Sequence, residues 1–128
     1  MFTLDQINEI HNNFGKKSTL PQYLHALNEI GVMKYDSFIT DGHSEYYGAE
    51  NQLLVSSAIH EKLAIAETSN LEALKIHLEL HAQGKTDYFQ MIQGLADSGV
   101  EKWTFNTSQL TIAYYDKAGN ELLADEID

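Results

Sequence analysis

The sequence contains no cysteine and no arginine, and Pro21 is its single proline. Without cysteine the chain cannot form a disulfide, a thiolate metal site or a thiol nucleophile. Without arginine it lacks the planar donor group that binds a phosphate or a guanine edge through two parallel hydrogen bonds. Its apolar runs are no longer than four residues, so we expect no transmembrane helix, and the first residues lack the basic and apolar pattern of a signal peptide.

Basic residues are scarce as well: 8 lysines stand against 19 acidic residues, which gives a net charge of −11. Such a chain repels phosphate backbones and anionic membrane surfaces, so we expect it to bind neither nucleic acid nor membrane. The acidity is typical of a cytoplasmic protein that is kept soluble by its charge. A second interpretation is a DNA-mimic inhibitor, which needs carboxylates in long rows, whereas here they are dispersed among lysines and apolar positions.

Four segments have the apolar period of an amphipathic helix. Each is preceded by a residue suited to cap a helix start, with Gln or Glu at the position that completes a capping box, and each is followed by glycine. The expected starts and ends are Thr3 and Gly15, Thr19 and Gly31, Ser69 and Gly84, and Thr86–Asp87 and Gly99.

Strand-like alternation follows the second and the fourth of these helices. The first group is 33–40, an Asp41-Gly42 turn and 43–47, and the second is 102–105, 110–115 and a last strand near 122–123. Residues 48–68 are weakly patterned, with short strand candidates at 53–55 and 63–65.

An internal repeat appears when the chain is compared with itself at an offset of 68 residues, where nine of forty positions from 20 to 59 are identical. The matches include helix ends and strand aromatics, such as Gly31 with Gly99 and Tyr46 with Tyr114. The sequence therefore predicts an α+β fold of two ααβββ repeats, in which antiparallel meander sheets pack against helix hairpins about a pseudo-twofold axis.

We expect residues 1–128 to form a single domain, with repeat-like halves at 3–59 and 70–127 and a connector at 60–69. A half of about 55–60 residues is marginally stable alone, so the two halves should share a core.

The best local cluster of chemistry-bearing residues follows the Asp41-Gly42 turn. In a strand, His43, Glu45 and Tyr47 project from one face, so that an imidazole, a carboxylate and a phenol lie together with Asp41 beside them. One interpretation is a ligand-binding patch, to which His81 could contribute across the interface between the halves. The other is a solvated hairpin edge with an aromatic residue that covers the sheet.

Metal and phosphate motifs are incomplete. His77 and His81 share a helical face at i and i+4, but neither a third histidine nor an acid lies nearby at ligand spacing. Gly84-Lys85-Thr86 resembles the end of a phosphate loop, but Glu79 stands where the first glycine is required. We therefore expect no metal, no cofactor and no catalytic residues.

Three segments resemble the small YdfO-like family of bacterial and prophage-borne proteins, sometimes labelled "phage envelope protein": residues 81–88, 98–103 and 114–121. Residues 41–43 and 65–70 resemble it too, so that the likeness covers nearly the whole chain. The resemblance implies an α+β fold and a domain of unknown function, and it brings no catalytic residues.

Three functional hypotheses follow from these observations. The first is a non-enzymatic cytoplasmic module, related to phages or mobile elements, that binds a protein partner or itself, since tyrosine is enriched at interfaces. The second is a small-molecule-binding or hydrolytic protein that uses His43 and His81. The third is the acidic DNA mimic.

Overall fold

A computed structural model describes residues 1–14 and 20–127 of the chain. This part contains four α-helices, a 3-10 helix and six strands. The helices are α1 (Leu4–Phe14), α2 (Leu20–Glu29), η2 (Ala49–Asn51), α3 (Leu71–Ala82) and α4 (Tyr88–Asp97). The strands are β1 (Lys34–Phe38), β2 (Ser44–Tyr47), β3 (Leu53–Val55), β4 (Lys102–Asn106), β5 (Thr111–Tyr115) and β6 (Glu121–Glu126). The predicted α+β class is confirmed.

Two of the predicted helix starts are confirmed as capping boxes. The Thr3 amide donates to Gln6 Oε1 at 2.8 Å, and the Gln6 amide donates to Thr3 Oγ1 at 3.2 Å. Asp87 and Gln90 make the same reciprocal pair at the start of α4. These bonds satisfy amides that have no partner within the first helical turn.

The predicted start of α3 at Ser69 is wrong by one residue. Asn70 caps this helix, because its side-chain oxygen accepts a hydrogen bond from the Ala73 amide at 3.0 Å. The Asn70 amide in turn donates to the carbonyl of Ser98 at 2.9 Å, which fixes the start of α3 against the end of α4. The start expected at Thr19 and the end expected at Gly15 lie outside the described residues.

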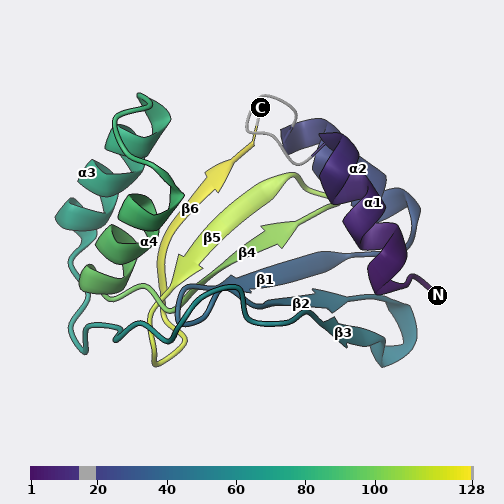
Figure 1. Cartoon of the computed structure of the whole chain (residues 1–128), viewed down its shortest axis with the longest axis horizontal. Coiled ribbons are helices and arrows are strands. Elements are labelled where there is room, and N and C mark those ends of the chain that lie inside the picture. The colour runs from purple at the N-terminus through teal and green to yellow at the C-terminus, as the bar shows by residue number, and fades with distance from the viewer. Residues whose placement is uncertain (15–19, 128) are drawn as a thin grey trace.

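The six strands form one antiparallel sheet in the order β3-β2-β1-β4-β5-β6 (Figure 1). The strands of each half make a meander, as expected, but β1 and β4 pair with each other over five residue pairs. Separate meander sheets are therefore replaced by one continuous sheet with the β1–β4 pairing at its centre.

The weakly patterned segment contains one strand rather than two. Leu53–Val55 forms β3, as expected, but residues 63–65 lie in the loop that leads from β3 to α3. The Leu63 amide donates to the carbonyl of Thr40 at 2.7 Å, while the side chains of Leu63 and Ile65 pack against a core cluster. These apolar residues anchor a loop, and the prediction of a strand at 63–65 is wrong.

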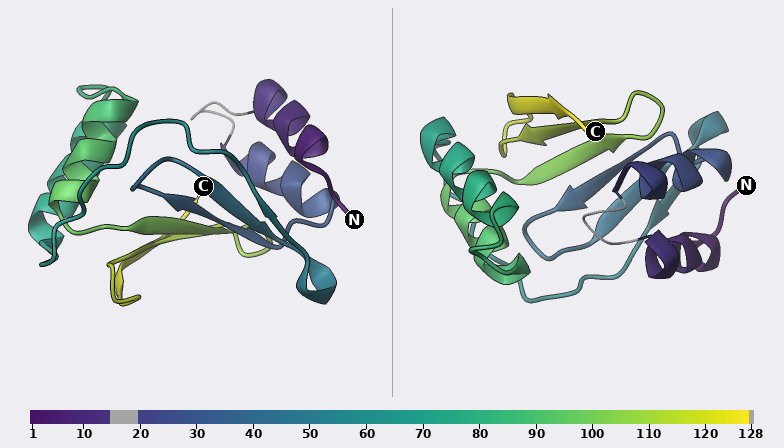
Figure 2. Two further views of the ribbon diagram at one scale, coloured as in Figure 1. Left: turned by 60° about the horizontal axis from the view of Figure 1, so that its bottom comes forward. Right: turned by 90° about the horizontal axis from the view of Figure 1, so that it is seen from above.

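Both helix pairs cover the same face of the sheet, one pair near each end of the central strands (Figure 2). Side chains alternate along a strand, so this helix face receives the buried aromatic residues of the sheet, and the opposite open face receives mostly polar ones. The open face carries Lys34, Asp36, Glu45, Lys102 and Thr104.

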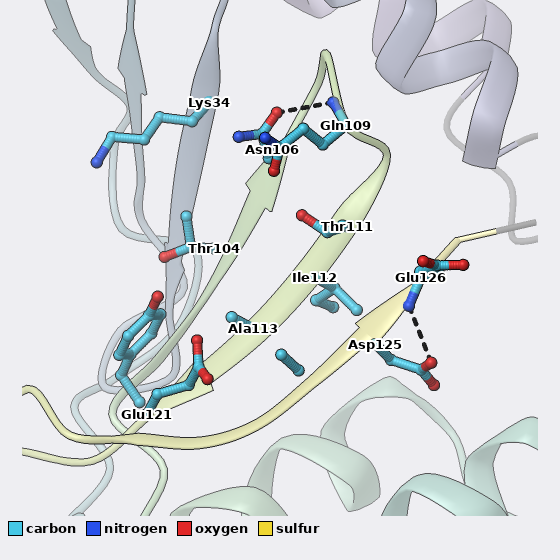
Figure 3. A pocket seen from close by; sticks show the side chains of 12 residues that line it. Lys34, Thr104, Asn106, Gln109, Thr111, Ile112, Ala113, Glu121, Asp125 and Glu126 are labelled. Atoms are coloured by element: carbon cyan, nitrogen blue, oxygen red, sulfur yellow. Dashed lines mark hydrogen bonds between the residues drawn. The ribbon is translucent and has the colours of Figure 1, made fainter.

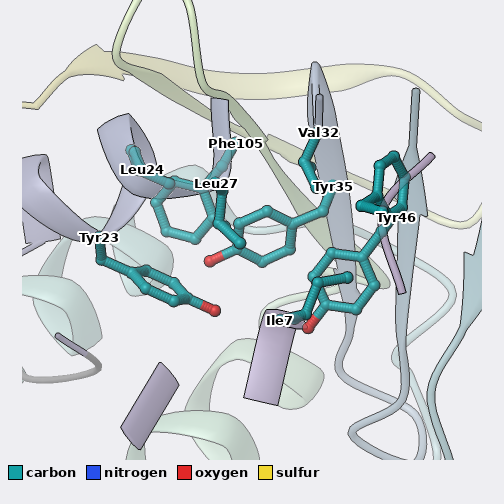
Figure 4. Packing of buried hydrophobic residues seen from close by; sticks show 9 residues of the cluster. Ile7, Tyr23, Leu24, Leu27, Val32, Tyr35, Tyr46 and Phe105 are labelled. Carbon is teal, nitrogen blue, oxygen red and sulfur yellow. The ribbon is translucent and has the colours of Figure 1, made fainter. Parts of the chain in front are cut away.

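The interior consists of two clusters. The first lies under α1 and α2 (Figure 4), and its buried members are Phe2, Ile7, Tyr23, Leu24, Leu27, Val32, Tyr35, Tyr46 and Phe105. The second lies under α3 and α4, and its buried members are Ile39, Leu74, Met91, Ile92, Leu95, Ala96, Val100 and Tyr114. Trp103 and Ile112 pack against both clusters and so connect the interiors of the two halves.

Three buried tyrosines shape the first cluster. The rings of Tyr35 and Tyr46 are stacked with their centroids 5.2 Å apart, and Tyr23 meets Tyr35 edge-on at 6.2 Å. Burial raises the pKa of all three hydroxyls, and hydrogen bonds within the group supply partners for these polar atoms. Tyrosine therefore serves here as a core residue.

Asp36 lies at the middle of the β1–β4 pairing, and its side chain is 3% exposed. One carboxylate oxygen accepts a hydrogen bond from Thr104 Oγ1 at 2.5 Å, and the other accepts one from Lys102 Nζ at 3.2 Å. A buried carboxylate is tolerated only where such partners compensate for the loss of water. These contacts tie β1 of the first half to β4 of the second.

The element order α-α-β-β-β occurs twice along the chain. Asp36 and Thr104, which are 68 positions apart, lie directly opposite each other in the β1–β4 pairing. The internal duplication itself stays a prediction.

We expect Lys102→Met to lower the free energy of unfolding by about 2–4 kcal/mol, because it leaves the buried carboxylate of Asp36 without its cation. Urea denaturation followed by circular dichroism measures the change. Lys62→Met, which removes an exposed lysine from the loop before α3, is the matched control and should change it by less than about 0.5 kcal/mol. Equal effects of the two substitutions would contradict the stabilising role of the Asp36 contacts.

Candidate functional site

The structure brings four of the five predicted site residues together on the open face. His43 Nδ1 lies 2.5 Å from Asp41 Oδ1, and His43 Nε2 lies 3.1 Å from Glu45 Oε2. The hydroxyl of Tyr47 donates to the other oxygen of Glu45 at 3.0 Å. The side chains therefore form one continuous chain of contacts from Asp41 to Tyr47, which we call the hairpin network.

The turn between β1 and β2 places the first members of this network. Gly42 has a φ of 78°, and its amide donates to the carbonyl of Phe38 at 2.9 Å. Asp41 Oδ1 also accepts from the backbone amide of His43 at 3.0 Å. The imidazole of His43 then stacks on the ring of Phe38, with centroids 4.4 Å apart and planes 7° from parallel.

The electrostatics of the network favour a protonated His43. Partial burial alone would lower its pKa, but the hydrogen bonds to Asp41 and Glu45 outweigh burial and raise the pKa above 6.5. For Asp41, burial opposes ionisation, but the two hydrogen bonds from His43 lower the net pKa below 3.8. Two carboxylates that hold both ring nitrogens fit an imidazolium, which donates from both.

Tyr47 ends the hairpin network next to the central strands. Burial first, and then the hydrogen bond to Glu45, raise its pKa to about 12. Its ring also lies under Lys34, whose Nζ is 4.8 Å from the ring centroid. Each member of the network is thus engaged with its neighbours, which fits the structural interpretation of the hairpin. A ligand patch here stays a prediction.

The structure does not bring His81 to the hairpin network. His81 lies near the end of α3, and its Nδ1 is 3.1 Å from the carbonyl of Thr86 in the turn before α4. It lines a cleft on the helix face, whereas His43 stacks on Phe38 on the open face. The two histidines therefore do not share one site in this structure.

His77 packs where α3 and α4 approach each other closely. A Cβ atom at Gly94 would lie 2.4 Å from His77 Nδ1, so any other residue at this position would displace the imidazole. Within residues 1–14 and 20–127, no group of three or more His, Asp and Glu residues is arranged to hold a metal ion.

A cleft of about 620 Å³ lies on the helix face, between the start of α2 and the α3–α4 pair. Its lining is mainly apolar and includes Trp103, the only tryptophan of the chain. Strands β4, β5 and β6 supply Trp103, Phe105, Ile112, Tyr114, Leu123 and Asp125, and the helices supply Leu20, Lys75, Leu78, Glu79, His81, Ala82, Met91 and Leu95. We call this the inter-helix cleft.

Trp103 combines two features that stand out in the cleft. Its ring meets Tyr114 edge-on, with centroids 6.5 Å apart. Its indole nitrogen is buried and has no hydrogen-bond partner among the described residues, which is uncommon for a buried donor. Burial, and then the charge of nearby Asp125, raise the pKa of Tyr114 to about 12.

The alternation over 102–105 predicts a strand with Trp103 and Phe105 on one face, but it does not identify a cleft there. The alternation of side chains was the available signal. It shows which residues face the helices, but not whether a helix covers them.

A second hollow, of about 540 Å³, lies against the open face beside β4, β5 and β6 (Figure 3). Its lining is more polar, with Lys34, Thr104, Thr111, Tyr115 and Glu121 around it. Asn106 closes one end, where its side-chain oxygen accepts from the Gln109 amide at 2.9 Å (Figure 3).

A family model described as "Protein of unknown function (DUF1398)" matches residues 8–126. The chain belongs to the DUF1398 family. The predicted assignment to a domain of unknown function is therefore confirmed, whereas the YdfO-like and phage attributions stay predictions. A comparison with curated proteins gives no match for this DUF1398 chain. None of the helices in the part that the structure describes is long and apolar enough to cross a bilayer.

We expect the hairpin network to make the stability of the DUF1398 protein depend on pH. Because the pKa of His43 is raised, its stabilising effect is complete below 6.5 and is lost as the pH rises through the raised value. Because the pKa of Asp41 is lowered, its effect is complete above 3.8 and is lost as the pH falls. The stability difference between wild type and His43→Gln should therefore be largest between these two values.

Thermal unfolding of both proteins across this pH range measures the difference in stability. The contributions of titratable groups that both proteins share cancel in this difference. His25→Gln is the control, since His25 forms only an exposed pair with Glu29 at 3.3 Å. A difference for His43→Gln that grows at alkaline pH, or is independent of pH, would show that the network does not hold a protonated histidine.

Proposed function

We propose that this DUF1398 protein is a non-enzymatic binding module that takes an apolar small molecule in the inter-helix cleft. The observation that carries the proposal is the lining of the cleft: aromatic side chains on the sheet, apolar side chains on three helices, and the sole tryptophan among them. Its volume of about 620 Å³ falls within the range of pockets that bind drug-sized ligands, about 300–1,000 Å³.

The polar groups of the cleft restrict the ligand further. Two acidic residues, Glu79 and Asp125, and one basic residue, Lys75, line the cleft. The whole chain has a net charge of −11. The electrostatics therefore favour a neutral ligand over an anionic one.

The alternative functions receive less support from the geometry. A hydrolytic role for His43 with His81 lacks a shared site, because the two side chains lie on opposite faces of the sheet. A DNA mimic requires rows of free carboxylates, whereas Asp36, Asp41, Glu45 and Glu67 each hold a partner within the chain.

The predicted origin and cellular location of the protein are part of the same proposal. A cytoplasmic protein from a phage or mobile element, built by duplication of an ααβββ unit, fits the charge, the resemblance and the repeated element order. The opposition of Asp36 and Thr104 supports the duplication, since a twofold axis between the halves would pass through this pair.

Binding of a neutral fluorescent probe, phenylnaphthylamine, tests the proposed function. We expect it to quench the emission of Trp103 by energy transfer in a saturable manner, because donor and acceptor would lie in the same cleft. Ala82→Phe adds a ring to an exposed position that lines the cleft and should weaken binding at least tenfold, about 1.4 kcal/mol.

Ala118→Phe makes the same substitution in the exposed turn before β6 and should leave binding unchanged. Circular dichroism and urea denaturation of both variants verify the fold. Absence of saturable quenching in the wild type, or equal binding by the two variants, would contradict a ligand site in the inter-helix cleft.

A further inference from the structure

The β3 edge of the sheet is open and free of charge. Leu53 and Val55 are 48% and 51% exposed, although both are apolar. Residues 51–59 contain no charged side chain, which is a long neutral stretch in a chain of net charge −11. The opposite edge, β6, carries Glu121, Asp125 and Glu126. Acidic side chains protect a sheet edge against pairing, and β3 lacks this protection.

The hydrogen bonds of β3 show which backbone groups are available. Ser56 donates to the carbonyl of Ser44, and Gly48 donates to the carbonyl of Gln52, both at 2.9 Å. In an antiparallel ladder, residue pairs alternate between bonded and non-bonded, so Leu54 is bonded to its partner Tyr46. The amides and carbonyls of Leu53 and Val55 therefore point away from β2, toward the open edge.

We propose that β3 pairs with β3 of a second copy of this chain, antiparallel and centred on Leu54. In this register Leu53 of each copy lies opposite Val55 of the other, and the two pairs exchange four backbone hydrogen bonds. The two copies of Leu54 meet across the twofold axis on the helix face. The result is a continuous sheet of twice six strands.

The side chains favour a second copy as the partner. In the proposed register each of the three residues of β3 lies opposite an apolar residue of the other copy. If the twofold axis passed through Val55 instead, Leu54 would lie opposite the polar residue Ser56. Leu54 also packs against the first core cluster, so the interface continues an existing apolar interior. Because the pairing is twofold symmetric, it buries the uncharged β3 edge of both copies and limits the assembly to a dimer.

The net charge gives this association a characteristic dependence on salt. Two chains of −11 repel each other, while the contacting edges are neutral. Salt screens the repulsion over a Debye length of about 10 Å at 0.1 M without weakening neutral backbone hydrogen bonds. Dimerisation should therefore strengthen as the ionic strength rises, whereas pairing through salt bridges would weaken.

Sedimentation equilibrium of the full chain at several salt concentrations tests the proposal. We expect a monomer–dimer equilibrium, and Val55→Glu should weaken it at least tenfold by placing a charge within the interface, next to Glu45 and opposite Leu53 of the other copy. Ala124→Glu adds the same charge to the β6 edge and should leave the β3 pairing intact. A strictly monomeric wild type, or equal weakening by both variants, overturns the proposal.

Engineered cysteines test the register, since the chain has none of its own. Residues opposite each other in a non-bonded antiparallel pair bring their Cβ atoms close enough for a disulfide. Under mild oxidation Leu54→Cys should therefore form a disulfide-linked dimer, while Leu53→Cys should not, because residue 53 lies opposite residue 55. A disulfide at Leu53→Cys but not at Leu54→Cys overturns the proposed register.

Discussion

The pairing of β1 with β4 is the contact on which the whole molecule depends. Each half contributes a three-stranded meander and a helix pair, which together are too small to bury a stable core alone. The five residue pairs between β1 and β4 merge the meanders, and the contacts of buried Asp36 with Lys102 and Thr104 make this register specific. A shift by one residue would place the Asp36 carboxylate among the aromatic residues of the helix face, where it would lack these partners.

This central pairing also sets the positions of the helix pairs and hence of the cleft. Val32 and Ile39 flank β1 and are buried in different clusters, so α1–α2 and α3–α4 pack over opposite ends of the same strands. Between the pairs, the aromatic side chains of β4 and β5 are covered incompletely, and the inter-helix cleft results. The hairpin network lies on the other face, where its charged groups are satisfied by one another. The two faces therefore differ in character: the helix face contains the apolar cleft, and the open face carries the hydrogen-bonded hairpin network.

Local features of the fold could be predicted from the sequence, and distant ones could not. The capping boxes at Thr3 and Asp87 involve residues three positions apart, and alternation placed His43, Glu45 and Tyr47 on one face. Ser69 and Asn70 are both competent caps, and the structure uses Asn70, whose amide also bonds the carbonyl of distant Ser98. The β1–β4 register, the loop at 63–65 and the cleft around Trp103 arise from contacts between distant segments, on which periodicity carries no information. For the same reason periodicity cannot show that the sheet separates His81 from His43.

The proposed function requires an apolar ligand to lie between the helix pairs, against the sheet. Nuclear Overhauser effects between bound phenylnaphthylamine and the protein, measured on the labelled full chain, test it most directly. We expect contacts from the probe to the indole protons of Trp103 and to the methyl groups of Met91 and Leu78. Contacts confined to Leu53 and Val55 at the sheet edge, or to the open face beside Tyr115, would contradict it.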